Sequence, residues 1–188
     1  QNSIDQFFYE DNGKKYMFWG SFRGIYATEL TDNGLEIKKK TDGTPVLKKR
    51  ICGNRFEGTN IYKRGEYYYL FASIGTCCNG ATSTYQTVVG RSKNVLGPYL
   101  DKTGRDMLYD YCEIIMSGNE TWAGPGHNSI LIQDDVGTDW IIYHGYKKKE
   151  AENGRYVLMD KLIWSNDGWP SVKSNAPSIL EVAPYFQK

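Results

Sequence analysis

The stretch FEGTNIYKRGEYYYLFAS at residues 56–73 decides the fold class of this chain. The stretch has the signature of a β-hairpin. It has a polar start and a short run of strand-forming residues, continues through a glycine-containing turn, and ends with an aromatic run followed by small residues. The same pattern recurs in IDQFFYEDNGKKYMFWGS at residues 4–21 and in GHNSILIQDDVGTDWIIYHG at residues 126–145. The sequence therefore predicts three hairpins that belong to one repeated unit.

Further strand-like segments follow each hairpin and extend it into a sheet. Third strands are predicted at residues 24–30, 84–92 and 155–164, and a shorter fourth strand is predicted at residues 35–38. Residues 100–122 have no clear period and are predicted to be a loop insertion. Because no segment sustains a 3.6-residue apolar period, helices should be few.

The polar residues that open the three units are regularly placed. Asp5 and Glu57 lie 52 residues apart, and Glu57 and His127 lie 70 residues apart. Four-stranded antiparallel sheets repeated about every 40–50 residues are typical of the blades of a β-propeller. The first strand of each blade lines the central axis, so residues at the start of these strands converge on one face. We therefore expect Asp5, Glu57 and His127 to meet in one pocket.

The number of repeated units is too small for a closed propeller. About three blades are present, whereas propellers typically have four to eight. The predicted fold class is all-β, a propeller of four-stranded antiparallel blades. Residues 1–188 are expected to form a single incomplete propeller domain whose N-terminal blades are missing.

Charge and composition narrow the class of partner. Lys and Arg number 23 against 22 Asp and Glu, which gives no reason to expect nucleic acid or an anionic membrane as partner. No apolar run approaches the 18 or so residues of a membrane span, and Gln1 does not open a signal peptide. The 15 Tyr, 7 Phe and 5 Trp suit strand cores, and exposed rings among them suit the C–H faces of sugars.

The chain has four cysteines, Cys52, Cys77, Cys78 and Cys112. No C-x-x-C pair exists, so a zinc site is not indicated. The neighbouring residues Cys77 and Cys78 are not expected to bridge to each other in ordinary backbone geometry. Free buried thiols are the first expectation, and a Cys52–Cys112 disulfide stays open.

Several motifs together resemble a known family. The chain is similar to the inverting five-bladed propeller glycosidases of glycoside hydrolase family 43, and within it to the endo-α-1,5-L-arabinanases. Order and spacing match along essentially the whole chain. The pieces that carry the resemblance are Ser3-Ile4-Asp5, Trp19-Gly20-Ser21, Phe56-Glu57-Gly58, Cys77-Cys78-Asn79-Gly80, Ser83-Thr84-Tyr85, Val89-Gly90-Arg91-Ser92, Gly97-Pro98-Tyr99, Gly124-Pro125-Gly126-His127-Asn128-Ser129 and Asp167-Gly168-Trp169-Pro170.

The resemblance implies a site with three carboxylates. Glu57 matches the general acid, and Asp5 matches the second aspartate, which orients the acid and modulates its pKa. The family's general base has no match, because no Asp precedes Asp5. His127 matches the central-channel histidine that lies beside a single calcium or sodium ion.

Substrate contacts are expected from loops around the pocket. The aromatic rings expected to stack on sugar are Trp19, Phe22 and Tyr85. The polar groups expected to contact sugar hydroxyls are Ser21, Asn79 and Arg91. The sulfurs of Cys77 and Cys78 are expected to pack on a furanose.

The resemblance implies an enzyme that hydrolyses α-1,5-linked L-arabinan with inversion. It also implies that this enzyme is secreted, periplasmic or located on the cell surface. Missing N-terminal blades or a second chain would close the ring. Two alternatives stay open: an exo-acting α-L-arabinofuranosidase or β-xylosidase of the same family, and a sugar-binding propeller without turnover. Because it lacks the base, this fragment alone could be inactive.

Overall fold

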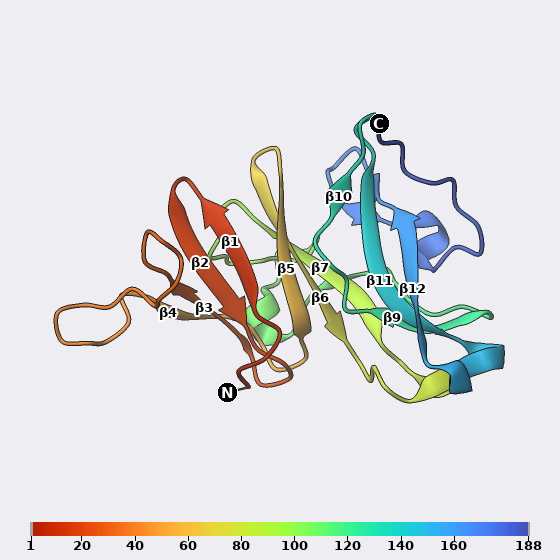
Figure 1. Ribbon diagram of the computed structural model, residues 1–188, viewed down its shortest axis with the longest axis horizontal. Helices are drawn as coiled ribbons and strands as arrows, with labels where there is room; N and C mark the ends of the chain where they lie inside the picture. Colours follow the sequence, from red (N-terminus) through yellow and green to blue (C-terminus); the bar gives the residue numbers. More distant parts are fainter. Residues whose placement is uncertain (1, 188) are drawn as a thin grey trace. The chain divides into compact units, whose positions relative to one another are not determined.

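The structure is a computed structural model that describes residues 2–187 and is built almost entirely from strands (Figure 1). The chain divides into two compact units. Unit 1 comprises the described residues up to Phe71 together with Val89–Glu113, and unit 2 comprises Ala72–Val88 and the described residues from Ile114 onward. No helix of the described chain is long and apolar enough to cross a membrane.

The first sheet lies in unit 1 and has the strand order β1-β2-β3-β4. Antiparallel pairing joins β1 (Phe7–Asp11) to β2 (Lys14–Trp19), β2 to β3 (Ile25–Glu29), and β3 to β4 (Lys48–Cys52). The β1–β2 turn uses Asn12 and Gly13, both at positive φ, which suits the twist of a two-residue hairpin. The predicted first hairpin and third strand are therefore confirmed.

The predicted fourth strand at residues 35–38 is wrong. That segment makes only an isolated bridge between Leu30 and Ile37, and Leu35 is 82% exposed. The fourth strand is β4, whose outward Lys48, Lys49 and Arg50 are exposed. Charged edge strands of this kind lack an apolar alternation, so the sequence pattern did not reveal it.

The second sheet has the order β5-β6-β7-β8. Its strands are β5 (Glu57–Arg64), β6 (Tyr67–Ile74), β7 (Gln86–Ser92) and β8 (Glu113–Met116). The predicted hairpin at residues 56–73 and the following strand are confirmed. Residues 100–122 are more than a loop, because they contain the short helix η2 (Met107–Tyr109), β8 and the first residue of β9.

The third sheet has the order β10-β11-β12, with β9 also paired to β11. Its strands are β9 (Trp122–Gly126), β10 (Ile132–Gln133), β11 (Asp139–Lys147) and β12 (Arg155–Lys161). The strand predicted to start at residue 126 instead ends there, because His127 adopts a left-handed conformation with φ 49°. The short strands β13 (Ile163–Trp164) and β14 (Pro170–Ser171) pair with each other. Short helices η1 (Gly80–Thr82), η3 (Lys148–Asn153) and η4 (Lys173–Asn175) complete unit 2.

The first sheet has two chemically different faces. Phe18 is fully buried on one face, paired in register with Phe7. Phe8 lies on the opposite face, opposite Met17, and is 52% exposed. The alternation of a β-strand accounts for this difference, because successive side chains point to opposite faces.

We expect Phe18→Ala to lower the free energy of unfolding of this chain by about 3–5 kcal/mol, because a fully buried ring leaves a cavity. Phe8→Ala is the matched control, the same truncation on the other face of the same sheet, and should cost less than about 1 kcal/mol. Urea denaturation followed by tryptophan fluorescence measures both. Equal losses in the two variants would show that the two faces are not as described.

Candidate active site

Glu57 opens β5 and is buried, with 8% of its surface exposed. The hydroxyl of Ser21 donates a hydrogen bond to Oε2 of Glu57 at 2.7 Å, and Ser21 is itself buried. Gly20 directs Ser21 inward from the end of β2: it has φ 130°, and a Cβ there would lie 2.2 Å from the carbonyl oxygen of Gly24. Only glycine fits this turn, so the Trp-Gly-Ser motif has a structural cause.

Asp5 lies beside Glu57 in unit 1. Its Oδ2 accepts a hydrogen bond from the backbone N–H of Gly58 at 3.2 Å, and Gly58 directly follows Glu57. Asp5 has φ 55°, a conformation that Asp tolerates better than most residues. The structure therefore brings together Asp5, Ser21 and Glu57, three of the residues that the sequence predicted for the site.

His127 lies in unit 2 within a cluster of rings. Its backbone N–H donates to Oγ of Ser73 at 2.7 Å, and its Nδ1 lies 3.4 Å from the hydroxyl of Tyr85. His144 stacks on both rings, with centroids 5.7 Å from Tyr85 and 6.3 Å from His127. The predicted His127 and Tyr85 therefore lie together. The expectation that His127 shares one pocket with Asp5 and Glu57 stays a prediction.

Sequence reasoning missed the role of His144 in this cluster. Burial, then the charges of Arg155 and His127, lower the pKa of His144 to about 4, so its ring is neutral at pH 7. Nη1 of Arg155 lies 3.3 Å from Nε2 of His144. A guanidinium only donates, so Nε2 is the acceptor if this contact is a hydrogen bond. The one available signal was that this chain has only two histidines, each directly after an apolar or glycine-rich stretch of sequence.

The cysteine prediction requires correction. Cys77 and Cys78 form a disulfide with each other, with Cα atoms 3.8 Å apart, whereas Cys52 and Cys112 are free thiols. The pair lies in a loop after β6 rather than in a regular strand, so the backbone is not held in the extended geometry that would keep neighbouring sulfurs apart. Burial raises the pKa of the Cys112 thiol to about 11 and that of Cys52 well above its usual value, so neither is poised to react.

The remaining predicted contact residues are spread out. Phe22 is 41% exposed, and its N–H donates to the carbonyl of Phe56, the residue before Glu57. Asn79 is exposed beside the disulfide, and its N–H donates to Oγ of Ser83. Trp19 is buried against Tyr26.

Arg91 lies apart from Tyr85. Its guanidinium covers the ring of Tyr67, with 4.3 Å to the centroid, near the end of β7 that is remote from Gln86. Arg91 follows Gln86 by five residue steps along the strand, which corresponds to about 16 Å. A sugar contact by Tyr85 or by Arg91 stays a prediction.

The ion predicted near His127 would need ligands from the surrounding side chains or from water. No group of three or more His, Cys, Asp and Glu side chains that could hold a metal ion occurs in the described part of the chain. The contacts described for His127 come from a serine, a tyrosine and a second histidine, not from the carboxylates and carbonyls that calcium prefers. These residues do not fit a protein-ligated calcium site.

Comparison with known proteins places the chain in a family. The model of glycosyl hydrolases family 43 matches residues 1–170, and the chain belongs to this family. It is 36% identical to an extracellular exo-α-(1→5)-L-arabinofuranosidase of Cellvibrio japonicus, over 87% of this chain and 49% of that protein. It is 35% identical to extracellular endo-α-(1→5)-L-arabinanase 1 of Bacillus subtilis, over 90% of this chain and 50% of that protein. The chain therefore spans about half the length of these relatives.

Solved structures agree with this assignment. The α-L-arabinanase of Cellvibrio cellulosa complexed with arabinohexaose superposes with a TM-score of 0.77 at 34% identity, over 92% of this chain and 57% of that chain. An exo-1,5-α-L-arabinanase from a bovine ruminal metagenomic library gives the same TM-score at 36% identity and the same coverage of both chains. The predicted fold class, antiparallel four-stranded sheets of the β-propeller type, is thereby confirmed.

Close packing around Gly126 generates a test of the ring cluster. A Cβ at Gly126 would lie 2.3 Å from Cδ1 of Tyr85 and 3.0 Å from Oγ of Ser73. We expect Gly126→Ala to destabilise the chain by about 1–3 kcal/mol and to shift the NMR resonances of the His127 ring, because the tyrosine must move.

Gly145→Ala is the control for this variant. Its nearest contact would be Cδ1 of Leu158, a flexible side chain, at 3.1 Å. The resonances of the His127 ring should stay in place in this variant. Unchanged His127 resonances in Gly126→Ala would contradict the packing described.

Proposed function

We propose that this chain is part of a glycosidase that hydrolyses α-1,5-linked L-arabinan with inversion. The observation that carries the proposal is the buried carboxyl of Glu57, held by Ser21 and adjoining the Asp5–Gly58 hydrogen bond, in a chain of family 43. Relatives named as arabinanases and arabinofuranosidases support arabinan as the substrate class.

Glu57 is assigned as the general acid. Inverting hydrolysis needs a carboxylic acid that protonates the leaving glycosidic oxygen while a carboxylate on the opposite face of the sugar activates water. Glu57 is buried and one of its oxygens is fixed by Ser21, so the carboxyl group is held in one orientation. Asp5 is the orienting and modulating carboxylate, since its hydrogen bond fixes the backbone directly after Glu57.

The general base is assigned to a part of the enzyme outside this chain. Inverting glycosidases separate the acid and the base by about 6.5–9.5 Å to leave room for the water. The apolar outer face of the first sheet supports the presence of further blades. Phe8 is exposed there, and Met17 and Trp19 line a cavity of about 440 Å³. A preceding blade, from a longer protein or a second chain, would cover this surface.

Sugar contacts are assigned within each unit. In unit 1, Phe22 is exposed next to the segment that leads into Glu57, and its ring suits stacking on a furanose. In unit 2, Asn79 and the Cys77–Cys78 disulfide offer polar and polarizable surface on one loop. Tyr85 is only 1% exposed, so it acts by holding His127 rather than by stacking on sugar.

Two further assignments rest on family resemblance. A single calcium or sodium ion near His127 would have to be coordinated largely by water, and no step of the mechanism depends on it. The enzyme is assigned to the cell exterior, in keeping with relatives named extracellular and with a disulfide in this chain.

We expect Glu57→Gln, introduced into the protein with its propeller complete, to lower kcat on linear arabinan by at least about 100-fold, because the amide cannot donate a proton to the leaving group. Arabino-oligosaccharide affinity, measured by calorimetry, should stay within about threefold. Ser3→Ala, a substitution at an exposed position in the same unit, is the control. Wild-type turnover in the Gln variant would exclude Glu57 as the acid.

The mode of cleavage is the second question, because relatives include both an exo-acting and an endo-acting enzyme. We expect the enzyme to release mixed oligosaccharides from linear arabinan early in the reaction. Chromatography of the products measures this release. A single short product from the first minutes would instead identify an exo-acting enzyme. Tight binding without new reducing ends would identify a sugar-binding propeller.

A further inference from the structure

Two exposed tyrosines on the insertion after β7 have no role in the proposed mechanism. Tyr109 is 71% exposed and Tyr111 is 42% exposed. They flank Asp110, which has φ 69° and ends the short helix η2. Exposed aromatic rings present flat apolar faces that a ligand can cover.

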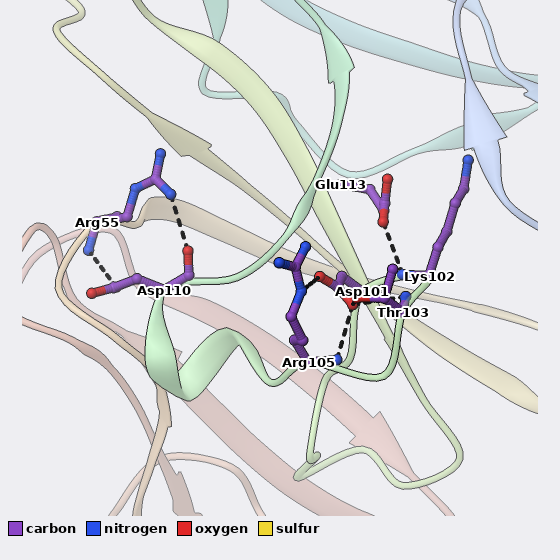
Figure 2. Close-up of polar contacts among 7 residues, drawn as sticks. All are labelled: Arg55, Asp101, Lys102, Thr103, Arg105, Asp110 and Glu113. Carbon is purple, nitrogen blue, oxygen red and sulfur yellow. Dashed lines mark hydrogen bonds and ion pairs between the residues drawn. The ribbon is translucent and has the colours of Figure 1, made fainter.

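Tyr111 is supported from beneath by a fixed cation. The guanidinium of Arg105 lies 4.5 Å from the centroid of the Tyr111 ring. Nε of Arg105 donates to Oδ2 of Asp101 at 2.8 Å, and the side chain of Asp101 is fully buried (Figure 2). The other carboxylate oxygen of Asp101 accepts from Thr103 and from the backbone N–H of Arg105. A buried carboxylate thus holds Arg105 in place, and Arg105 holds one face of the ring.

The insertion is also fixed next to the segment that leads into Glu57. The backbone N–H of Arg55 donates to Oδ1 of Asp110 at 3.1 Å, and Nη1 of Arg55 donates to the carbonyl of Asp110 at 3.0 Å (Figure 2). A Cβ on Gly53 would lie 2.1 Å from the same Oδ1, so glycine is required for this approach. Arg55 precedes Glu57 by two residues, a span of at most about 7 Å.

We propose that Tyr109 and Tyr111 form a distal sugar-binding subsite for L-arabinofuranosyl units of the polysaccharide remote from the bond that is cleaved. This inference rests on the proposed function. The exposed part of the Tyr111 ring packs against the C–H face of a furanose, and the terminal N–H groups of Arg105 donate to its hydroxyls. Tyr109 provides the neighbouring contact on the other side of Asp110.

The chemistry of the surface favours a sugar over a protein partner. Charged groups lie close to both rings: Arg105 covers one face of Tyr111, and Asp110 stands between Tyr109 and Tyr111 in the sequence. Aspartate is depleted at protein interfaces, whereas here Asp110 stands directly between the two tyrosines. A furanose presents C–H surface and hydroxyl groups within one unit, and therefore matches an aromatic ring backed by a cation.

The test compares oligosaccharides of increasing length in the complete protein. We expect Tyr111→Ala to weaken binding of arabinohexaose about threefold to tenfold and to leave binding of arabinobiose unchanged, by calorimetry. Tyr109→Ala should show the same length dependence with a smaller loss, and Tyr111→Phe should bind like wild type. Tyr185→Ala, at a tyrosine of similar exposure outside unit 1, is the matched control.

Each outcome decides the proposal. Equal losses for the short and the long ligand in Tyr111→Ala would overturn it, because they would show general damage to the site. Wild-type binding of arabinohexaose by Tyr111→Ala would also overturn it. If Glu57→Gln still cleaved arabinan while Tyr111→Ala showed the length-dependent loss, the mechanism would fail and the subsite would stand. Wild-type protein that binds no arabino-oligosaccharide would overturn both.

Discussion

The hydrogen bond from Ser21 to Glu57 is the contact on which the candidate site depends. A carboxyl group that has lost most of its water needs a fixed polar partner, and a hydroxyl on the neighbouring strand connection supplies it. That hydroxyl is in place only because Gly20 makes a turn that no side chain would fit. The chemistry of the acid is therefore tied to the shape of the turn at residues 20–24 in the first sheet and to the first residue of the second sheet.

Three residues that the sequence predicted for function, two in unit 1 and one in unit 2, have unusual backbone conformations. Asp5, Phe22 and His127 all have positive φ although none is a glycine. Such residues persist only where surrounding contacts hold them, and here Gly58, Phe56 and Ser73 provide hydrogen bonds to them or to their neighbours. Each of these three positions was singled out from the sequence by its side chain, but its backbone conformation was not foreseeable.

The first two hairpins, the all-β class and the proximity of Asp5 to Glu57 could be predicted, because they follow from alternation, turn residues and motif order. The strand β4 could not, because Lys48-Lys49-Arg50 looks like solvated loop until its pairing with β3 is known. The strand β9 is rich in glycine and proline, which in a single sequence indicate a turn. The Cys77–Cys78 disulfide and the neutral ring of His144 arise from irregular backbone and from burial, neither of which has a sequence period.

The anchoring of the insertion by Arg55, Asp110 and Gly53 has a consequence for protein engineering. Asp110 of this loop is hydrogen-bonded to Arg55 and packs against Gly53, so the conformation of the loop depends on two stretches of sequence. A chimera that exchanges residues 100–112 with those of another enzyme would carry over the exposed rings without the groups that position them. A chimera that keeps the conformation of this loop must therefore also include Gly53 and Arg55.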